Sequence, residues 1–247
     1  FGANTEYAVI MFQRSVGLVD DGKVGDKTRT ALAGGNISKL LKGSDYTAAA
    51  KRLKVSELAI RVFGATEGRG VGFLNNGKAK ILLERHRMYF YLVQLKGKTF
   101  ANAQMKQYPN LVNTATGGDK GDTAEYTRLS LAKNISPEAA LMSCSWGQFQ
   151  IMGENWKDLG YSSVFDFETQ MQTSESLQLE AFIRFIEWKT GTVNGKKVAL
   201  IDALRAENWE AVFTLYNGQN YKKLGYQAKF QKEWDHLEPI YGEKKAA

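Results

Sequence analysis

Glu67 stands where a single carboxyl group could act as an acid catalyst. It ends the apolar run VFGATE, and the glycine-rich stretch GRGVG follows it directly. We expect a helix to end here, which places the carboxyl at the negative end of the helix dipole and against an apolar wall. Both surroundings raise the pKa of a carboxyl group, and a carboxyl that stays protonated near neutral pH is suited to general acid catalysis. The alternative is a solvated glutamate at a helix end.

Glu84 is the first candidate for a second catalytic carboxylate. It follows the segment VGFLNNGKAKILLE, in which Asn76 and Gly77 are a strong signal for the turn of a β-hairpin. A hairpin that starts at the helix end and returns a second glutamate can place two carboxyl groups across a cleft, as glycoside hydrolysis requires. Glu84 would then stabilise the developing cation or position water. Its alternative role is a surface ion pair with a neighbouring arginine.

Three further acidic residues compete with Glu84 for this role. The polar, glycine-rich segment 114–129 predicts a mobile loop that enters a helix near Thr123. Tyr126 in this segment could stack on a sugar ring. The separation of the two carboxyl groups is not fixed by the sequence, so inversion and retention both stay open. The competing carboxylates are Asp119, Asp122 and Glu125.

Two amide side chains follow a short predicted helix that Ser136 caps and Pro137 starts. After the helix breaks at SCSWGQ, Gln148 and Gln150 alternate with apolar residues. In an extended segment, the amides would lie on one face and the apolar side chains on the other. Such amides can hydrogen-bond to the N-acetyl and hydroxyl groups of a saccharide. The alternative is a pair of solvated glutamines at a turn.

Two predicted helices position the polar groups. The first begins at the N-cap Ser56, and we expect Gly68 and Gly70 to take the left-handed conformations that end it. The second begins at the N-cap Asn208 and closes at the segment 216–218, where the glycine is typical of a C-terminal cap. Both helices carry an apolar side, so we expect them to pack in the core.

The composition limits the possible chemistry. The chain of 247 residues has a formal net charge of +7, which favours a polyanionic partner such as nucleic acid, an anionic membrane face or an acidic cell-wall polymer. Its basic residues are spread along the chain, which disfavours nucleic acid, and no apolar stretch reaches the roughly 20 residues of a membrane span. Cys144, His86 and His236 are too few ligands for an ordinary zinc site. We therefore expect no metal and no cofactor, although His86 alone could serve as the base of a nucleophilic mechanism.

We expect two unequal domains. Residues 1–35 include a helix, a turn and a second helix that Asp26 caps. Residues 36–50 predict a linker that becomes helical near its end, and residues 51–243 predict the larger domain. Within it, the apolar pattern from 166 to 188 predicts one long core helix. The chain starts in what resembles the middle of a motif, so we expect a trimmed N-terminus.

The N-terminal pattern FQ...GL..DG.VG.KT..AL resembles the three-helix peptidoglycan-binding module without its first helix. The resemblance implies binding to the bacterial cell wall. We therefore expect peptidoglycan as the partner of this domain.

The larger domain resembles the phage-type N-acetylmuramidase domain of modular endolysins, a branch of the lysozyme-like superfamily. The segments ATEGRGVGF, ILLERH, EYTRLSLA, SCSWGQFQIMGENW and LYNGQNY follow one another in family order. Glu67 matches the catalytic acid of the family. Ser145 and Gln148 lie in SWGQFQIM, which is similar to the segment that lines the saccharide cleft of goose-type lysozymes and lytic transglycosylases. Tyr216 and Asn217 resemble their tyrosine-asparagine segment.

The resemblance implies a mainly α, lysozyme-like fold of the goose-type lysozyme and lytic transglycosylase kind, with a small β-hairpin. It implies cleavage of the β-1,4 bond from N-acetylmuramate to N-acetylglucosamine by a monomer that needs no cofactor, binds no nucleic acid and does not insert stably into membranes. It also implies a stay in the host bacterial cytoplasm until release to the periplasm and cell wall at lysis. Two alternatives are a lytic transglycosylase, which forms 1,6-anhydro ends, and a non-catalytic wall-binding protein.

Overall fold

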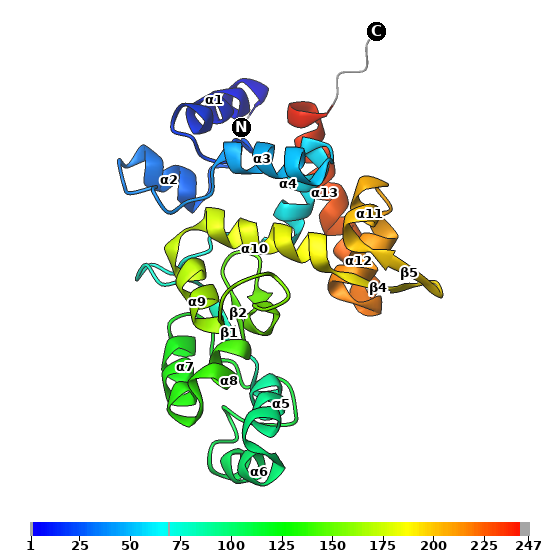
Figure 1. Ribbon diagram of the computed structural model, residues 1–247. Coiled ribbons are helices and arrows are strands. Elements are labelled where there is room, and N and C mark those ends of the chain that lie inside the picture. The colour runs from blue at the N-terminus through cyan, green and yellow to red at the C-terminus, as the bar shows by residue number, and fades with distance from the viewer. Residues whose placement is uncertain (1, 69, 243–247) are drawn as a thin grey trace. The chain divides into compact units, whose positions relative to one another are not determined.

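The protein is mainly helical, as predicted (Figure 1). The computed structural model describes residues 2–68 and 70–242. The chain divides into two compact units: the first combines the N-terminal segment up to residue 71 with the C-terminal segment from residue 179, and the second is residues 72–178. No helix among the described residues is long and apolar enough to cross a membrane.

The first unit begins with three helices, α1 (Ala3–Ser15), α2 (Asp26–Leu32) and α3 (Gly43–Leu53). Gln13 is buried at the end of α1, and its amide donates to Asp21 Oδ1 at 2.9 Å and to Thr28 Oγ1 at 3.1 Å. This amide therefore fixes the turn between α1 and α2. Asp26 was predicted as the N-cap of α2, but Gly25 occupies that position and Asp26 is the first helical residue. There its charge still faces the positive end of the helix dipole.

Helix α4 (Glu57–Glu67) is almost wholly buried and carries Glu67 as its last residue. As predicted, Ser56 caps it: the serine hydroxyl accepts from the backbone N–H of Ala59 at 3.1 Å. Gly68 does not take the predicted left-handed conformation, because with φ −63° it leaves the helix in an extended one. Gly70 does take it, with φ 76°. Helix α13 (Tyr226–Tyr241) lies along α4 (Figure 1).

The rest of the first unit completes a core around α4. Helix α12 begins at the predicted N-cap Asn208, whose side chain accepts from the N–H of Ala211 at 3.2 Å. It ends at the predicted C-cap Gly218, whose φ is 77°. The elements of this part are β4 (Thr190–Val193), which pairs antiparallel with β5 (Lys196–Ala199), α11 (Leu200–Arg205), α12 (Trp209–Asn217) and the short 3₁₀ helix η2 (Gln219–Leu224).

The predicted single helix over 166–188 is wrong, because two helices occupy this stretch. Helix α9 (Val164–Thr173) ends at Ser174, which is extended with φ −160° and ψ 159°. The hydroxyl of Ser174 accepts from the N–H of Leu177 at 3.2 Å and so caps α10 (Glu175–Trp188). A serine that can cap a new helix therefore interrupts an apolar pattern that continues through it.

The second unit contains five α-helices, a short 3₁₀ helix and a small sheet. Strand β2 lies in the middle of the sheet and pairs antiparallel with β1 and β3, so that Ile81 faces Trp146 and Ser145 faces Met152. The elements are β1 (Ile81–Leu83), α5 (Arg85–Lys96), α6 (Lys98–Gln107), α7 (Ala124–Ile135), α8 (Pro137–Met142), β2 (Cys144–Trp146), β3 (Ile151–Met152), η1 (Gly153–Asn155) and α9. The predicted start of α7 near Thr123 is confirmed.

The predicted hairpin that should end at Glu84 is wrong in its pairing. The turn at Gly77 forms, with the N–H of Leu74 donating to Lys78 O at 2.8 Å, but only one bridge, between Phe73 and Ala79, extends it. The following residues pair with β2 instead. The reason is burial, since β1 packs its apolar side chains inside the unit through this partner. Glu84 therefore lies at the N-cap position of α5.

The predicted extended segment at Gln148 and Gln150 is also wrong. Residues 147–150 form the turn between β2 and β3, with Gly147 at φ 71° and Gln150 at φ 51°. The helix before them is as predicted, since Ser136 accepts from the N–H of Ala139 at 3.4 Å and Pro137 starts α8. The two glutamines therefore lie on a tight turn and not on one face of a strand.

Candidate active site

The carboxyl group of Glu67 is held from two sides. Asn217 Nδ2 at the end of α12 donates to Glu67 Oε1 at 3.2 Å. The hydroxyl of Tyr226, the first residue of α13, donates a short hydrogen bond to Glu67 Oε2. The side chain is largely buried, with 9% of the residue exposed. Two predicted site residues, Glu67 and Asn217, are thus brought together, and Tyr226 joins them from α13, where no site residue was predicted.

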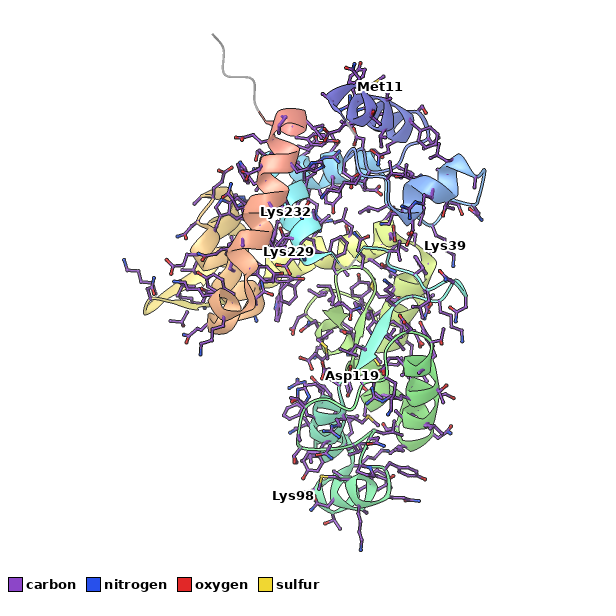
Figure 2. The ribbon with its side chains drawn as sticks, turned by 180° about the vertical axis from the view of Figure 1, so that it is seen from behind. Met11, Lys39, Lys98, Asp119, Lys229 and Lys232 are labelled. Atoms are coloured by element: carbon purple, nitrogen blue, oxygen red, sulfur yellow. The ribbon has the colours of Figure 1, made fainter. Side chains whose placement is uncertain are left out.

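The backbone next to Glu67 is also fixed by α13. Lys229 Nζ donates a short hydrogen bond to the carbonyl oxygen of Thr66; Figure 2 labels this lysine on α13. The last carbonyl groups of a helix carry its negative partial charge, so a lysine at this end stabilises α4. The hydroxyl of Thr66 donates to Val62 O at 2.7 Å. Helix α13 therefore holds both the main chain and the side chain at the end of α4.

Tyr216, the other predicted residue of α12, lies in an aromatic cluster. Its ring packs edge-on against Phe63 at 5.3 Å, Phe182 at 5.6 Å and Phe185 at 5.5 Å. Edge-to-face packing at these distances stabilises a core. The cluster joins α4, α10 and α12 and so positions the end of α12, where Asn217 follows. A contact of Tyr216 with substrate stays a prediction.

Glu84 belongs to the second unit. Its backbone N–H donates to Ser143 O at 2.9 Å, and its carboxyl Oε2 lies 3.4 Å from Nδ1 of His86. The side chain is 29% exposed, so it can reach solvent. Glu67 belongs to the first unit, and the pairing of the two glutamates in catalysis stays a prediction.

The three rival carboxylates differ in their surroundings. Asp119, labelled in Figure 2, and Asp122 are exposed on the loop before α7. Glu125 is fully buried and is used in packing: it pairs with Arg128 Nη1 at 2.6 Å and accepts from the N–H of Leu83 at 2.9 Å. A carboxylate satisfied in this way inside the protein anchors β1 to α7. Of the three, only the two aspartates can meet substrate directly.

The predicted saccharide-binding residues of the second unit meet at the turn between β2 and β3. Ser145 Oγ donates to Gln150 Oε1 at 2.9 Å, and Gln150 Nε2 donates to Gly147 O at 2.8 Å. The backbone N–H of Gln148 donates to the buried Gln178 Oε1 at 2.7 Å. The turn is thus fixed by side-chain hydrogen bonds, and the structure brings Ser145, Gln148 and Gln150 together.

Tyr126 has a structural environment. Its hydroxyl donates to Ala79 O and accepts from Gln172 Nε2, each at 2.7 Å, and Lys78 Nζ lies 4.7 Å from the ring centroid. Burial raises the pKa of Tyr126 to about 12, although the hydrogen bond from Gln172 opposes the shift. The residue joins α7 to the segment before β1, and its stacking on a sugar stays a prediction.

Other kinds of chemistry find little support in the described part of the chain. There, no group of three or more histidine, cysteine, aspartate or glutamate side chains is placed to hold a metal ion. Cys144 is buried in β2, and burial raises the pKa of its thiol. A thiol that stays protonated is a poor nucleophile.

Comparisons with known proteins identify the family of the chain. The N-acetylmuramidase family matches residues 57–238, and a peptidoglycan binding domain matches residues 1–32. The crystal structure of a Burkholderia AP3 phage endolysin is similar with a TM-score of 0.87 and 41% sequence identity, over 97% of this chain and 88% of that chain. No curated protein matches the chain. The predicted family resemblances and the predicted lysozyme-like helical fold are confirmed by these matches.

Proposed function

Because the chain belongs to the N-acetylmuramidase family, we propose that Glu67 is the acid with which it cleaves peptidoglycan. The chain is a glycoside hydrolase of the endolysin kind. The bond that it cleaves is the β-1,4 linkage between N-acetylmuramate and N-acetylglucosamine. Neither the transglycosylase nor the non-catalytic alternative is favoured by the matches.

The observation that carries this proposal is the double hydrogen bonding of the Glu67 carboxyl by Asn217 and Tyr226. A general acid must hold its proton within hydrogen-bond reach of the leaving oxygen, so its side chain must have one orientation. Two donors from two helices, together with a largely buried side chain, supply that orientation. In the reaction, the O–H of Glu67 protonates the glycosidic oxygen, the bond to the anomeric carbon breaks, and Glu67 is left as a carboxylate.

Water must then add to the anomeric carbon, which needs a second group. We retain Glu84 for this role, because its carboxyl is partly exposed, with Asp119 and Asp122 as its rivals. In an inverting reaction, this carboxylate takes a proton from the water whose oxygen bonds to the anomeric carbon. In a retaining reaction, it bonds to that carbon itself and water then displaces it; both routes leave a reducing sugar end. The distance of this carboxylate from the acid decides between inversion and retention.

Ser145, Gln148 and Gln150 are proposed to bind the saccharide. Their support is the fixed turn, in which internal hydrogen bonds hold the Gln150 amide in one orientation. An amide held in this way donates to a carbonyl or hydroxyl oxygen without losing further rotamer entropy. Tyr216 and Asn217 of the first unit are also proposed to contact the saccharide, and Asn217 acts on Glu67 as well.

Residues 1–35 are proposed as a wall-binding module, residues 36–50 as its connection and residues 51–243 as the catalytic domain. Support for the first comes from the peptidoglycan-binding match. Contacts within the first unit tie this module to α4: Asp20 lies 2.6 Å from Arg14 Nε and 3.3 Å from Arg61 Nη1. The module is therefore proposed to be packed on the catalytic domain.

The oligomeric state, the partners and the location of the protein are also proposals. We infer a monomer without nucleic-acid partner or stable membrane insertion, kept in the host cytoplasm until lysis and then active at the wall. The similarity to a phage endolysin supports the lytic role. Size-exclusion chromatography with light scattering tests the monomer, and a dimer would contradict it.

Mass spectrometry of the muropeptides released from purified walls tests the reaction. A hydrolase leaves reducing N-acetylmuramate ends, because water supplies the hydroxyl group. Dominant 1,6-anhydro ends would instead assign the chain to the transglycosylases. Products with reducing N-acetylglucosamine ends would show that the other glycosidic bond is cut.

A further inference from the structure

A cavity of about 260 Å³ is lined by residues of α6 and α7, within the second unit. Helix α6 starts at Lys98, which Figure 2 labels. The lining side chains of α6 recur at the spacing of one helical face, and those of α7 do the same. The lining residues that matter here are Phe100, Gln104, Gln107, Tyr108, Leu131 and Asn134.

The cavity offers apolar surface to solvent. Phe100 is 36% exposed, Tyr108 is 39% exposed and Leu131 is 50% exposed. In the part of the chain that the structure describes, neither aromatic ring packs on another ring or on a cation. Aromatic rings with free faces provide flat surfaces for an apolar or partly apolar ligand.

The cavity also offers three amides whose hydrogen bonds are unused. Within the described residues, the side chains of Gln104, Gln107 and Asn134 have no protein partner. Each amide supplies a carbonyl acceptor and an NH₂ donor. No charged side chain lines the cavity. Its chemistry is therefore neutral, with flat apolar surfaces and groups that both donate and accept hydrogen bonds.

We propose that this cavity is a second saccharide site that binds one N-acetylglucosamine unit of peptidoglycan. A pyranose ring has apolar C–H faces that pack on Phe100 and Tyr108, and its hydroxyl and acetamido groups match the three amides. The volume is slightly below the roughly 300 Å³ at which pockets for drug-sized ligands begin, so one sugar unit fits better than several. The inference rests on peptidoglycan as substrate and does not depend on the role of Glu67.

Other occupants fit this chemistry less well. An anion, including the lactyl carboxylate of N-acetylmuramate, would find no cation in the lining. An apolar helix would cover three amides without pairing them, and a buried unpaired amide costs roughly 1–3 kcal/mol. The neutral sugar of the glycan strand satisfies both the rings and the amides.

The consequence for the enzyme is attachment to its polymeric substrate at a second point. Two linked contacts on one polymer raise the apparent affinity beyond that of either contact alone. We therefore expect the cavity to matter for binding to insoluble walls, which present many sugar units.

The test is an NMR titration of ¹⁵N-labelled full chain carrying Glu67→Gln, with tri-N-acetylchitotriose as the probe. The side-chain NH₂ signals of Gln104, Gln107 and Asn134 are expected to shift with saturable dependence on the sugar. Adding Phe100→Ala should weaken this binding by roughly three- to tenfold, the effect of losing one aromatic contact. Phe165→Ala is the matched control, because this ring is 50% exposed on α9 of the same unit but does not line the cavity.

Two outcomes would overturn the site: no shift of the three NH₂ signals at saturating sugar, or equal shifts with and without Phe100→Ala. If these signals broaden with rising protein concentration in the absence of sugar, the cavity is a contact between two copies of the chain. This result would also overturn the saccharide site. A failure of Glu67 as the acid is a separate result, since it would appear as lysis of permeabilised cells by Glu67→Gln, whereas the three NH₂ signals report on the cavity alone. Sedimentation with purified walls gives a second readout, in which Phe100→Ala lowers the bound fraction several-fold and Phe165→Ala does not.

Discussion

The hydroxyl of Tyr226 donates to the carboxyl of Glu67, although the two residues are 159 positions apart in the chain. The ring of Tyr226 packs on Phe213 at 5.7 Å, which fixes the direction of the hydroxyl. A donor of this kind stabilises the carboxylate form, which Glu67 would take after proton transfer in its proposed role as the acid. We therefore propose that Tyr226 is a positioning residue that acts through Glu67.

Replacing Tyr226 by phenylalanine tests this role, because the substitution keeps the ring and removes the donor. We expect kcat on soluble glycan fragments to fall roughly tenfold or more with little change in KM, as for an interaction that matters most in the transition state. The alkaline limb of the kcat profile should move to higher pH, since the protonated form of the acid then persists further.

Tyr221→Phe is the matched control for this substitution. The ring of Tyr221 packs on Phe213 at 5.5 Å, and its buried hydroxyl has no hydrogen-bond partner among the described residues. Its pH profile should match that of the parent. An unchanged profile for Tyr226→Phe as well would show that Tyr226 only packs.

Asp20 joins the N-terminal module to α4, and its protonation should affect stability. Burial alone would raise the pKa of Asp20, but hydrogen bonds with Tyr241 and Arg14 and the charge of Arg61 outweigh burial and leave the pKa lowered. A carboxyl whose pKa is lower in the folded state than in the unfolded state stabilises the fold at pH values above its unfolded pKa of about 3.9. This contribution is lost as the pH falls through the folded pKa.

Asp20→Asn is therefore expected to lower the free energy of unfolding by roughly 1.5–3 kcal/mol at pH 7, because it removes one of the two carboxylates that pair with the buried Arg61, the other being Glu57. In urea titrations, the difference from the parent should stay constant above about pH 4 and shrink at lower pH. Asp26→Asn is the control, since Asp26 is an exposed residue of the same module and should change stability by less than about 0.5 kcal/mol. A difference that is the same at pH 7 and pH 3 would contradict the assigned titration.

Gly147 fixes the turn that carries the proposed saccharide-binding residues. Its φ is 71°, and a Cβ atom there would come within 2.6 Å of Gln178 Cγ. Gly147→Ala is therefore expected to lower the free energy of unfolding by more than Gly77→Ala does. At Gly77 φ is 77°, but nothing lies within 4 Å of a Cβ atom. Backbone strain lowers the free energy of unfolding by roughly 1–2 kcal/mol in both variants. Overpacking against Gln178 lowers it by roughly 1–3 kcal/mol more in Gly147→Ala alone. Thermal melts of the two variants measure the difference, and equal melting temperatures would show that Gln178 moves aside freely.

The sequence predicted those parts of the fold that depend on neighbouring residues. The caps at Ser56, Ser136 and Asn208 are correct because each side chain meets a backbone N–H three residues later. The helix break at Ser174 was missed because the same local signal lay within an unbroken apolar pattern. A helix-capping signal is therefore reliable where no longer apolar pattern continues across it.

Features that depend on distant partners were predicted poorly. The pairing of β1 with β2 joins segments about 60 residues apart, and nothing in the hairpin signal at Gly77 excludes it. The same reason explains Tyr226, which reaches Glu67 only because α13 packs along α4. The place of Glu67 at the end of α4 was predictable, since an apolar helix that ends in a glutamate before glycines is a local pattern, whereas its role as the acid stays a prediction.

The Glu67→Gln variant gives the most direct test of the proposed acid, in a turbidity assay on permeabilised cells paired with a thermal melt at pH 7. Glutamine keeps the shape of the side chain and cannot donate the proton, so lysis should fall by at least roughly a hundredfold while the melting temperature is not lowered. Glu138→Gln, at an exposed position of the second unit, should lyse cells like the parent. Lysis by Glu67→Gln at the parental rate would contradict the assignment of Glu67 as the acid, and a melting temperature well below the parent would show that Glu67 is instead a structural anchor.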